Sequence, residues 1–334
     1  MPERLFKNLN SYHTINSKRI KNDSFLIVLD YDYFLQKKDF KTLLYKFQKI
    51  IVIPLKECIH LDISLILKSK DLSASTNLTI VYNPFYQGYL GNALVKNIEK
   101  NNRIKVKNVW DFCENYLKKC YVSDNISIEN PNIENLTHFG FKTRLIKKSI
   151  DWIVGVSIYF LSQPLWLISA IKIHLESPGP IFYRQDRVGI RKNEFQIIKF
   201  RSMQTDAEVK GAQFSKKKDT RIFPWGKTMR STRIDELPQL FNILKGELSL
   251  IGPRPERKIF IAEFEKQIPQ YNERHVVKPG ISGYAQIMYP YGSGVIDARH
   301  KLMYDLYYIK NWTLILEIEI FIKTIIAVVT KKGI

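Results

Sequence analysis

Acidic residues and cysteines are scarce in this sequence of 334 residues. Lys and Arg together number 52, whereas Asp and Glu number only 32, so the formal net charge is +20 at pH 7. Such an excess favours a negatively charged partner: nucleic acid, anionic lipid or a phosphorylated substrate. Hydrophobic residues make up 45% of the chain and charged residues 25%. This balance excludes a disordered chain and a polytopic membrane protein.

The three cysteines, Cys58, Cys113 and Cys120, are an odd number without the spacing of zinc ligands. They favour a reducing compartment and ordinary structural roles. The first ten residues contain no apolar core after their basic residues, so no secretory signal peptide is expected there.

The N-terminal part lacks the glycines of a dinucleotide-binding loop. Such a site needs glycines directly after the first strand, but the sequence there is Asp30-Tyr31-Asp32-Tyr33. Apolar runs alternate with helix-like stretches such as 34–48, which predicts a small, Rossmann-like parallel α/β sheet. The strands are predicted at 25–29, 50–53, 78–82 and 104–106.

We expect residues 1–135 to form a structural or regulatory α/β domain that binds no nucleotide. The Asn- and Ser-rich segment 121–140 is typical of a linker. Residues 136–334 would form a second domain. It carries most of the charge excess, with a net charge of +14 against +6 in the first part.

A stretch of 20 residues, 152–171, contains no charged side chain and would form about 30 Å of helix. Basic residues flank both ends, so both ends are expected on the cytoplasmic side. Gln163 and Pro164 lie near the middle, where proline removes a backbone hydrogen bond and bends a helix. A re-entrant helix over about 150–172 explains both features. A transmembrane span or a buried soluble helix explains them less well. The basic residues before the stretch are Lys142, Arg144, Lys147 and Lys148.

The apolar segment 312–329 also contains Glu317, Glu319 and Lys323. This pattern suits a helix that lies in a membrane interface. Packing against the core of the domain is a comparable alternative.

The chemical information is densest around Asp235 and Glu236. Asp235 is predicted to cap a helix that continues through an apolar face and ends at Gly246. Both carboxylates could serve only to cap the helix and complement its dipole. The same place suits chemistry, because a helix N-terminus attracts phosphate. A carboxylate that stays ionised there could attack phosphorus without a general base.

A diphosphate substrate at this place would require Mg²⁺ and basic side chains to offset its charge. Lys199 and Arg201 lie close together in Ile198-Lys199-Phe200-Arg201, and Arg254 lies in Gly252-Pro253-Arg254-Pro255. A single arginine is usually a solvated surface charge. Several of these basic residues, however, lie beside proline or glycine turns rather than on periodic helix faces, which favours a binding role.

From about residue 145 to its end, the chain resembles the bacterial sugar transferase family of monotopic phosphoglycosyl transferases. The matching motifs, in order, are Ser177-Pro178-Gly179-Pro180-Ile181-Phe182, Arg184-Gln185 with Arg187-Val188-Gly189, Lys199-Phe200-Arg201-Ser202-Met203, Asp235-Glu236-Leu237-Pro238-Gln239-Leu240, Leu244-Lys245-Gly246-Glu247-Leu248-Ser249, Gly252-Pro253-Arg254-Pro255, Arg274-His275, Lys278-Pro279-Gly280-Ile281 and Tyr304-Asp305-Leu306-Tyr307-Tyr308. So many motifs in one order make the resemblance specific.

The resemblance implies a transfer in two steps. In this family the Asp of the Asp-Glu pair attacks the β-phosphorus of a UDP-sugar, and UMP leaves. Polyprenyl (undecaprenyl) phosphate then takes the sugar phosphate, which begins a surface glycan such as lipopolysaccharide, capsule, exopolysaccharide or a glycoprotein glycan. Carried over, Asp235 is the nucleophile and a ligand of Mg²⁺, and Glu236 is its partner and a candidate general base. The matching substrate-binding positions are Lys199, Arg201, Arg230, Arg254 and Asp305.

The resemblance also implies an α+β, mainly helical catalytic domain that contacts membrane lipid through a re-entrant helix. It would lie on the cytoplasmic face of the bacterial inner membrane. The family usually breaks this helix at Ser-Pro, whereas this chain has Gln163-Pro164. Arg233 stands where a small hydroxyl residue is common and adds a charge beside the expected diphosphate. The sequence leaves open which UDP-sugar is used and whether the chain forms a homodimer.

Two other classes of function fit the sequence less well. A nucleic-acid-binding protein would explain the charge, but no helix-turn-helix, zinc or RRM signature is present, and the uncharged stretch would stay unexplained. Nucleic acid is therefore not expected as a partner. A catalytically inactive membrane scaffold of the same fold is disfavoured by the intact Asp235-Glu236 pair.

Overall fold

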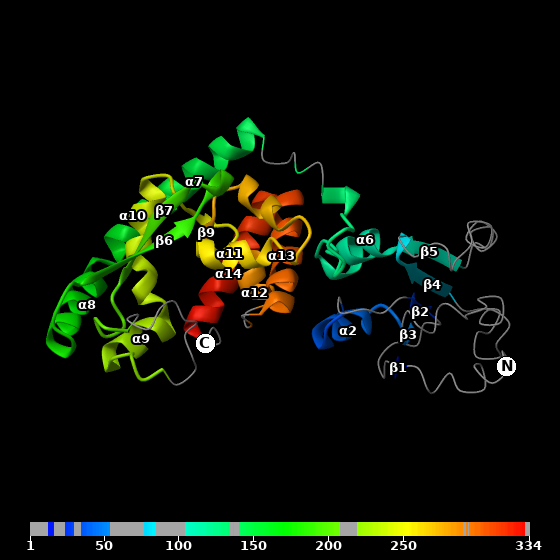
Figure 1. The fold of residues 1–334 in the computed structure, drawn as a ribbon, viewed down its shortest axis with the longest axis horizontal. Helices are drawn as coiled ribbons and strands as arrows, with labels where there is room; N and C mark the ends of the chain where they lie inside the picture. Colours follow the sequence, from blue (N-terminus) through cyan, green and yellow to red (C-terminus); the bar gives the residue numbers. More distant parts are fainter. Residues whose placement is uncertain are drawn as a thin grey trace. The chain divides into compact units, whose positions relative to one another are not determined.

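The chain separates into two compact units, Met1–Asp124 and Asn125–Ile334 (Figure 1). The computed structural model describes residues 13–16, 24–29, 35–53, 77–84, 104–133, 136, 140–207, 219–289, 292 and 294–330. Asp30–Tyr33 and Cys58, singled out in the sequence, lie outside the described residues.

The N-terminal unit contains the predicted parallel sheet. Its strand order is β1-β3-β2-β4-β5, and all neighbours are parallel except β1 and β3. The four strands predicted from apolar runs are confirmed, and the short β1 is an addition at the edge. The strands are β1 His13–Asn16, β2 Ser24–Leu29, β3 Lys49–Ile53, β4 Asn77–Tyr82 and β5 Ile104–Asn108.

Short helices accompany this sheet. The predicted helix over 34–48 is shorter in the structure, where α2 covers Lys37–Leu43. Cys113 and Cys120 are both buried, and Cys113 is a free thiol. Burial raises the pKa of the Cys113 thiol to about 12, so the thiol stays protonated and unreactive. Helix α6 covers Val109–Phe112 and is followed by a π-helical turn, Cys113–Leu117.

The C-terminal unit is mainly helical and contains two small sheets. An antiparallel hairpin joins β6 and β7, and a short parallel pair joins β8 and β9. The strands are β6 Phe182–Val188, β7 Glu194–Phe200, β8 Ser249–Ile251 and β9 Gly280–Ser282. The helices are α7 Phe141–Leu161, α8 Gln163–Glu176, α9 Pro224–Thr232, α10 Leu240–Leu244, α11 Lys258–Phe264, α12 Tyr284–Met288, α13 Val295–Lys310 and α14 Leu314–Val329. Short 3₁₀ turns lie at Pro131–Ile133, Ile190–Lys192, Ile234–Gln239 and Tyr271–Val276.

Part of the predicted linker belongs to the C-terminal unit. The side-chain amide of Gln270 pairs with the backbone of Asn130 at both of its atoms. Its Oε1 accepts from the Asn130 N–H at 2.9 Å, and its Nε2 donates to the Asn130 carbonyl at 3.2 Å. The Gln270 amide thus pairs with Asn130 as a peptide group of a neighbouring strand would. The composition of 121–140 does not predict this contact.

Helices α7 and α8 form a bent pair, with an angle of 59° between them (Figure 1). Pro164 lies in the first turn of α8, where a missing N–H leaves no helical hydrogen bond unmade. The Tyr159 carbonyl accepts hydrogen bonds from Ser162 Oγ and Gln163 Nε2 instead. The bend therefore lies at the predicted position. Among the described residues, no individual helix has the length and apolar character to cross a membrane, whereas this bent pair meets both requirements when taken together.

Aromatic rings hold the bend against the rest of the unit. Trp166 donates from Nε1 to Ser162 Oγ at 3.0 Å, and its ring packs edge-on against Phe200 and Phe241. Phe200 ends β7 and Phe241 lies in α10, so the bent pair is fixed to two elements that flank Asp235 and Glu236.

Helix α14 has one face in the core and one apolar face outside it. Glu317 and Ile320 are buried. Glu317 contacts Lys147 on α7 and Tyr308 on α13. Its carboxylate therefore lies inside the domain and not at a membrane surface. The exposed apolar residues of α14 are Leu314, Ile315, Ile318, Ile322, Ile325, Ile326 and Val329. Core packing is thus confirmed for the buried face, and the position of the exposed face in a membrane interface stays a prediction.

Asn242 fixes α10 to the edge of the β6–β7 hairpin. Its fully buried side chain accepts from the Ile198 N–H at 3.1 Å and donates to the Gln196 carbonyl at 2.7 Å. Lys199 follows directly on β7. The orientation of η6 (Ile234–Gln239) and α10 relative to Lys199 thus depends on this amide.

Replacing Asn242→Ala should lower the free energy of unfolding by about 2–4 kcal/mol, because it leaves buried polar groups without partners. The measurement is denaturant unfolding of the purified protein, with the exposed Asn193→Ala as the matched control. Equal unfolding midpoints for the two variants would show that Asn242 does not hold α10 in place.

Candidate active site

Asp235 and Glu236 lie in a tight turn between two helices. Helix α9 ends at Thr232 and is capped by Arg233, whose backbone is left-handed with φ 60° and ψ 14°. The chain then forms the 3₁₀ turn η6, Ile234–Gln239, before α10 begins. The prediction that Asp235 caps a helix is wrong, because Arg233 occupies the cap position and both carboxylates fall inside the first turn. The predicted stop at Gly246 is confirmed by its φ of +79°.

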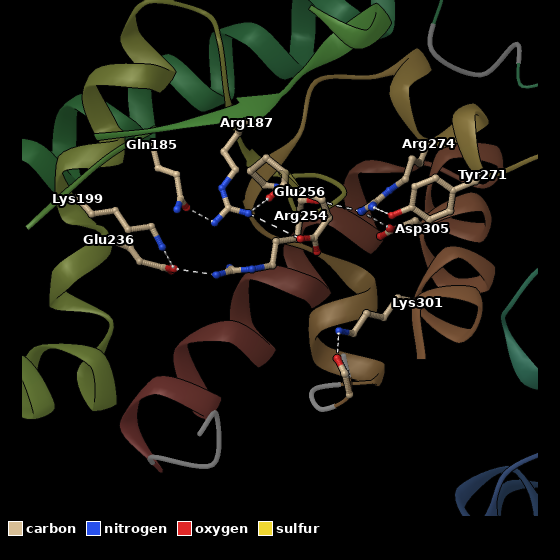
Figure 2. Close-up of polar contacts among 12 residues, drawn as sticks. Gln185, Arg187, Lys199, Glu236, Arg254, Glu256, Tyr271, Arg274, Lys301 and Asp305 are labelled. Carbon is tan, nitrogen blue, oxygen red and sulfur yellow. Dashed lines mark hydrogen bonds and ion pairs between the residues drawn. The ribbon is translucent and has the colours of Figure 1, made fainter. Parts of the chain in front are cut away.

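Glu236 is buried among three basic side chains. Its Oε1 lies 3.1 Å from Lys199 Nζ and 3.3 Å from Arg254 Nη2, and its Oε2 lies 3.4 Å from Arg233 Nη1. Figure 2 shows Lys199 and Arg254 approaching this carboxylate from two sides. Burial alone would raise the pKa of Glu236, but Lys199 and Arg254 hold it well below its usual range. A carboxylate held so strongly in its ionised form suits a counter-ion better than a proton acceptor.

Asp235 is equally buried, but its surroundings differ. Its Oδ1 is buried and has no hydrogen-bond partner among the described residues. Burial and the neighbouring charge of Glu236 raise the pKa of Asp235 to about 6, while the charges of Lys199 and Arg230 oppose the rise. The carboxylate is therefore mostly ionised at pH 7, with one oxygen left for a ligand.

Positive charge exceeds negative charge around this pair. Lys199, Arg230, Arg233 and Arg254 all act on the two carboxylates. Burial lowers the pKa of Lys199, although Glu236 opposes this effect. These cations are partly exposed, and an excess of positive charge that is partly withdrawn from water favours the binding of an anion. We call Asp235, Glu236 and these four basic residues the cation cage.

Arg187 on β6 lies beside the cage. Its guanidinium donates to Gln185 Oε1 at 2.6 Å and to the Pro255 carbonyl at 3.1 Å, and it lies 3.7 Å from Glu256 (Figure 2). Burial lowers the pKa of Arg187 to about 10, so it stays charged at pH 7.

Asp305 lies behind Arg254 rather than against the two carboxylates. Arg274 connects Asp305 with Arg254, because its Nη2 donates to Asp305 Oδ2 and to the Arg254 carbonyl, both at 2.9 Å. Its Nη1 donates to Tyr271 Oη at 2.7 Å. Burial raises the pKa of Asp305 to about 6, although Arg274 opposes this. Asp305 thus acts on the cage through the backbone of Arg254 (Figure 2).

The structure does not bring Arg201 to the carboxylates. Its guanidinium donates to the Pro180 carbonyl and to both Ser177 Oγ and the Ser177 carbonyl. These bonds shape the turn 177–180, which connects α8 to β6. Of the predicted substrate-binding residues, Lys199 and Arg254 therefore pair with Glu236, Arg230 acts on Asp235 by its charge, and Asp305 and Arg201 contact other groups.

Sequence reasoning gave no role to several residues that surround the cage. Arg187 and Arg274 belong to motifs that carry the family resemblance, which was the one signal available for them. Tyr271 and Glu256 gave no signal. The partner of Glu256 is Arg187, far along the chain on β6, whereas Tyr271 accepts from Arg274, only three residues later.

The described residues contain no group of three or more His, Cys, Asp or Glu side chains that could hold a metal ion. Mg²⁺ does not need such a group, because it is commonly held by one or two carboxylates together with substrate phosphates. The unpartnered Asp235 Oδ1 is a suitable ligand of that kind. The residues present therefore fit Mg²⁺ that arrives with a phosphorylated substrate.

Comparison with known proteins gives one family. The family model described as bacterial sugar transferase matches residues 142–331. A UDP-N-acetylgalactosamine-undecaprenyl-phosphate N-acetylgalactosaminephosphotransferase of Aeromonas hydrophila is 48% identical over 188 residues, which are 56% of this chain and 44% of that protein. A UDP-glucose:undecaprenyl-phosphate glucose-1-phosphate transferase of Xanthomonas campestris pv. campestris is 41% identical over 185 residues, 54% of this chain and 38% of that protein.

A shorter relative aligns over most of its own length. This putative undecaprenyl-phosphate N-acetylgalactosaminyl 1-phosphate transferase of Bacillus subtilis is 41% identical over 160 residues, 47% of this chain and 88% of that protein. The match to the Aeromonas and Xanthomonas proteins, in contrast, spans less than half of their length. The family match covers more than half of this chain and includes every residue of the cation cage. The chain therefore belongs to the bacterial sugar transferase family.

Proposed function

We propose that this chain transfers a sugar 1-phosphate from a UDP-sugar to polyprenyl phosphate and releases UMP. The observation that carries the proposal is the cation cage, in which an ionised carboxylate with an unpartnered oxygen lies among more positive than negative groups. A diphosphate supplies the missing negative charge, and its phosphorus is the electrophile that such a carboxylate attacks.

In the first step, a carboxylate oxygen of Asp235 forms a bond to the β-phosphorus. The bond from that phosphorus to the bridging oxygen breaks, and UMP leaves with the electron pair. Asp235 needs no base for this, because its carboxylate is already ionised at pH 7. Lys199, Arg230 and Arg254 offset the charge that moves to the leaving phosphate.

In the second step, a phosphate oxygen of polyprenyl phosphate attacks the phosphorus of the phosphosugar-Asp235 ester. The bond to Asp235 breaks, and the carboxylate returns to its ionised state with its electron pair. Glu236 remains the counter-ion of Lys199, Arg233 and Arg254 throughout. The cage therefore keeps its geometry while charge enters and leaves.

Asp235 Oδ1 would hold Mg²⁺ together with the diphosphate, and Glu236 lies next to it in the chain. When bound, the ion supplies additional neutralisation of the diphosphate charge.

The lipid acceptor implies a membrane location. The bent pair carries large exposed apolar side chains, among them Phe160, Leu161 and Leu167. We propose that α7 and α8 enter one leaflet of the bacterial inner membrane from the cytoplasmic face and return. The exposed apolar face of α14 would then rest on the same surface.

The family relatives indicate which donors to test and which pathway to expect. Their names specify N-acetylgalactosamine in Aeromonas and glucose in Xanthomonas, and a 35% identical relative in Rhizobium leguminosarum bv. phaseoli is named an exopolysaccharide production protein. We propose that this chain begins a surface glycan, with UDP-N-acetylgalactosamine as the first donor to test.

Replacing Asp235→Asn should reduce UMP release at least about 10³-fold and abolish the covalent phosphosugar adduct, because the amide is no nucleophile. The measurement uses membrane-reconstituted protein with Mg²⁺, polyprenyl phosphate and a panel of UDP-sugars. Asp186→Asn, at an exposed site on β6, is the matched control. Full turnover in the Asp235 variant would refute the assignment of the nucleophile.

Replacing Glu236→Gln should lower kcat by about 10²-fold, because the three cations lose the charge that fixes their positions. Binding of the UDP-sugar should stay equal or become tighter, since the cage becomes more positive. Steady-state kinetics and calorimetric binding measure the two effects, with the exposed Glu194→Gln as control. Weaker binding at an unchanged kcat would contradict the counter-ion role.

Removing divalent cations with EDTA should stop UMP release, and Mg²⁺ added in excess should restore it. Release of UMP at the full rate in EDTA would show that the cage alone neutralises the diphosphate.

A further inference from the structure

A second buried charge cluster lies outside the cation cage. Lys147 on α7 donates to Glu317 on α14 and lies 3.6 Å from Asp151 one turn later. Each of these three side chains is at most 8% exposed. The second oxygen of Glu317 accepts from Tyr308 Oη and from Trp312 Nε1, both at 2.8 Å. Charges buried this deeply are retained only where their partners are fixed.

This cluster reaches strand β8 from two sides. Asp151 Oδ1 accepts from the Leu250 N–H at 3.0 Å. Tyr308 Oη lies 3.2 Å from the Ile251 carbonyl, so its one proton is shared between this carbonyl and Glu317. The same cluster thus bonds the backbone of two consecutive residues of β8.

Strand β8 leads into the cation cage within three residues. Gly252 and Pro253 follow Ile251 and are bonded to the neighbouring segment, through Gly252 N–H to the Ser282 carbonyl and Gly280 N–H to the Pro253 carbonyl. A Cβ at Gly252 would lie 2.6 Å from the Lys278 carbonyl, so this passage is closely packed. Arg254 follows and reaches Glu236. Because this passage is hydrogen-bonded and closely packed, a displacement of β8 would also displace Arg254.

We infer that Lys147, Asp151, Tyr308 and Glu317 form a positioning cluster that sets Arg254 against Glu236. The inference rests on the proposed function for the reaction that Arg254 serves. Lys147 and Asp151 directly precede the uncharged stretch of α7 and α8. The positioning cluster thus contacts α7 just before the uncharged stretch and also sets the position of Arg254. The packing of the bent helix pair is therefore coupled to the geometry of the cation cage.

The test uses Tyr308→Phe, which keeps the buried ring and removes only the hydroxyl. It should lower the kcat of UMP release about five- to tenfold, the size expected for one lost hydrogen bond. Tyr284→Phe is the matched control, because Tyr284 is a buried tyrosine of the same core and its ring packs against Tyr304 and Tyr307. It should keep its kcat.

A double-mutant cycle separates positioning from general stability. In an Arg254→Lys background, Tyr308→Phe should change the single-turnover rate less than about twofold, because the residue through which it acts has been altered. Effects that multiply would overturn the positioning role.

Amide hydrogen exchange tests the cluster without any activity. Exchange of the amides of residues 249–252 and 254 should rise at least about tenfold in Tyr308→Phe, while that of 194–200 on β7 stays unchanged. Asp151→Asn, which keeps the shape of the side chain, should raise exchange at Leu250 in the same direction. Unchanged exchange in both variants would refute the cluster even where the chain releases UMP. If the wild-type chain releases no UMP from any UDP-sugar, the proposed function fails, and the exchange result still decides whether the cluster holds β8.

Discussion

The architecture of the C-terminal unit depends on one buried carboxylate, that of Glu236. Its three cations come from separate segments: Lys199 from β7, Arg233 from the end of α9, and Arg254 from the turn after β8. An unpaired buried charge costs several kcal/mol, so each segment must reach this point for the fold to be stable. The backbone of Arg233 is left-handed at the place where its guanidinium pairs with Glu236.

The two adjacent carboxylates, Asp235 and Glu236, therefore have different surroundings and different roles. Glu236 is fully engaged by cations and holds the frame. Asp235 keeps an oxygen without a partner among the described residues, and its pKa is raised to about 6 by burial and by Glu236. Under the proposed function, the nucleophile needs a lone pair that no hydrogen bond occupies, whereas the counter-ion needs all of its bonds made. One residue could not meet both requirements, which gives a physical reason for the pair.

The sequence was informative where local patterns decide the structure. Continuous apolar runs located four strands, Pro164 located the bend, and Gly246 located the end of α10. It failed where distant partners decide. In place of the N-cap predicted at Asp235 there is a 3₁₀ turn, in which Arg233 occupies the cap position and pairs with Glu236. Arg201 was expected at the substrate, yet its donors are used by the turn at Ser177. The role of Arg274 depends on Arg254 and Asp305, which lie 20 and 31 residues away.

The basic residues at the start of α7 show the same limit and explain part of the large positive charge. Lys142, Arg144, Lys147 and Lys148 are equivalent in composition, but the helix sorts them by face. Lys147 is buried against Glu317, whereas the other three are exposed. An exposed cation beside an apolar surface can meet lipid phosphates, while a buried one can only meet a carboxylate. Under the proposed function, the excess charge therefore serves two sites: exposed cations at the start of α7 would face the membrane, and the cation cage would bind a diphosphate. Lys147 belongs to neither group, because its buried charge pairs with Glu317 and Asp151 in the positioning cluster.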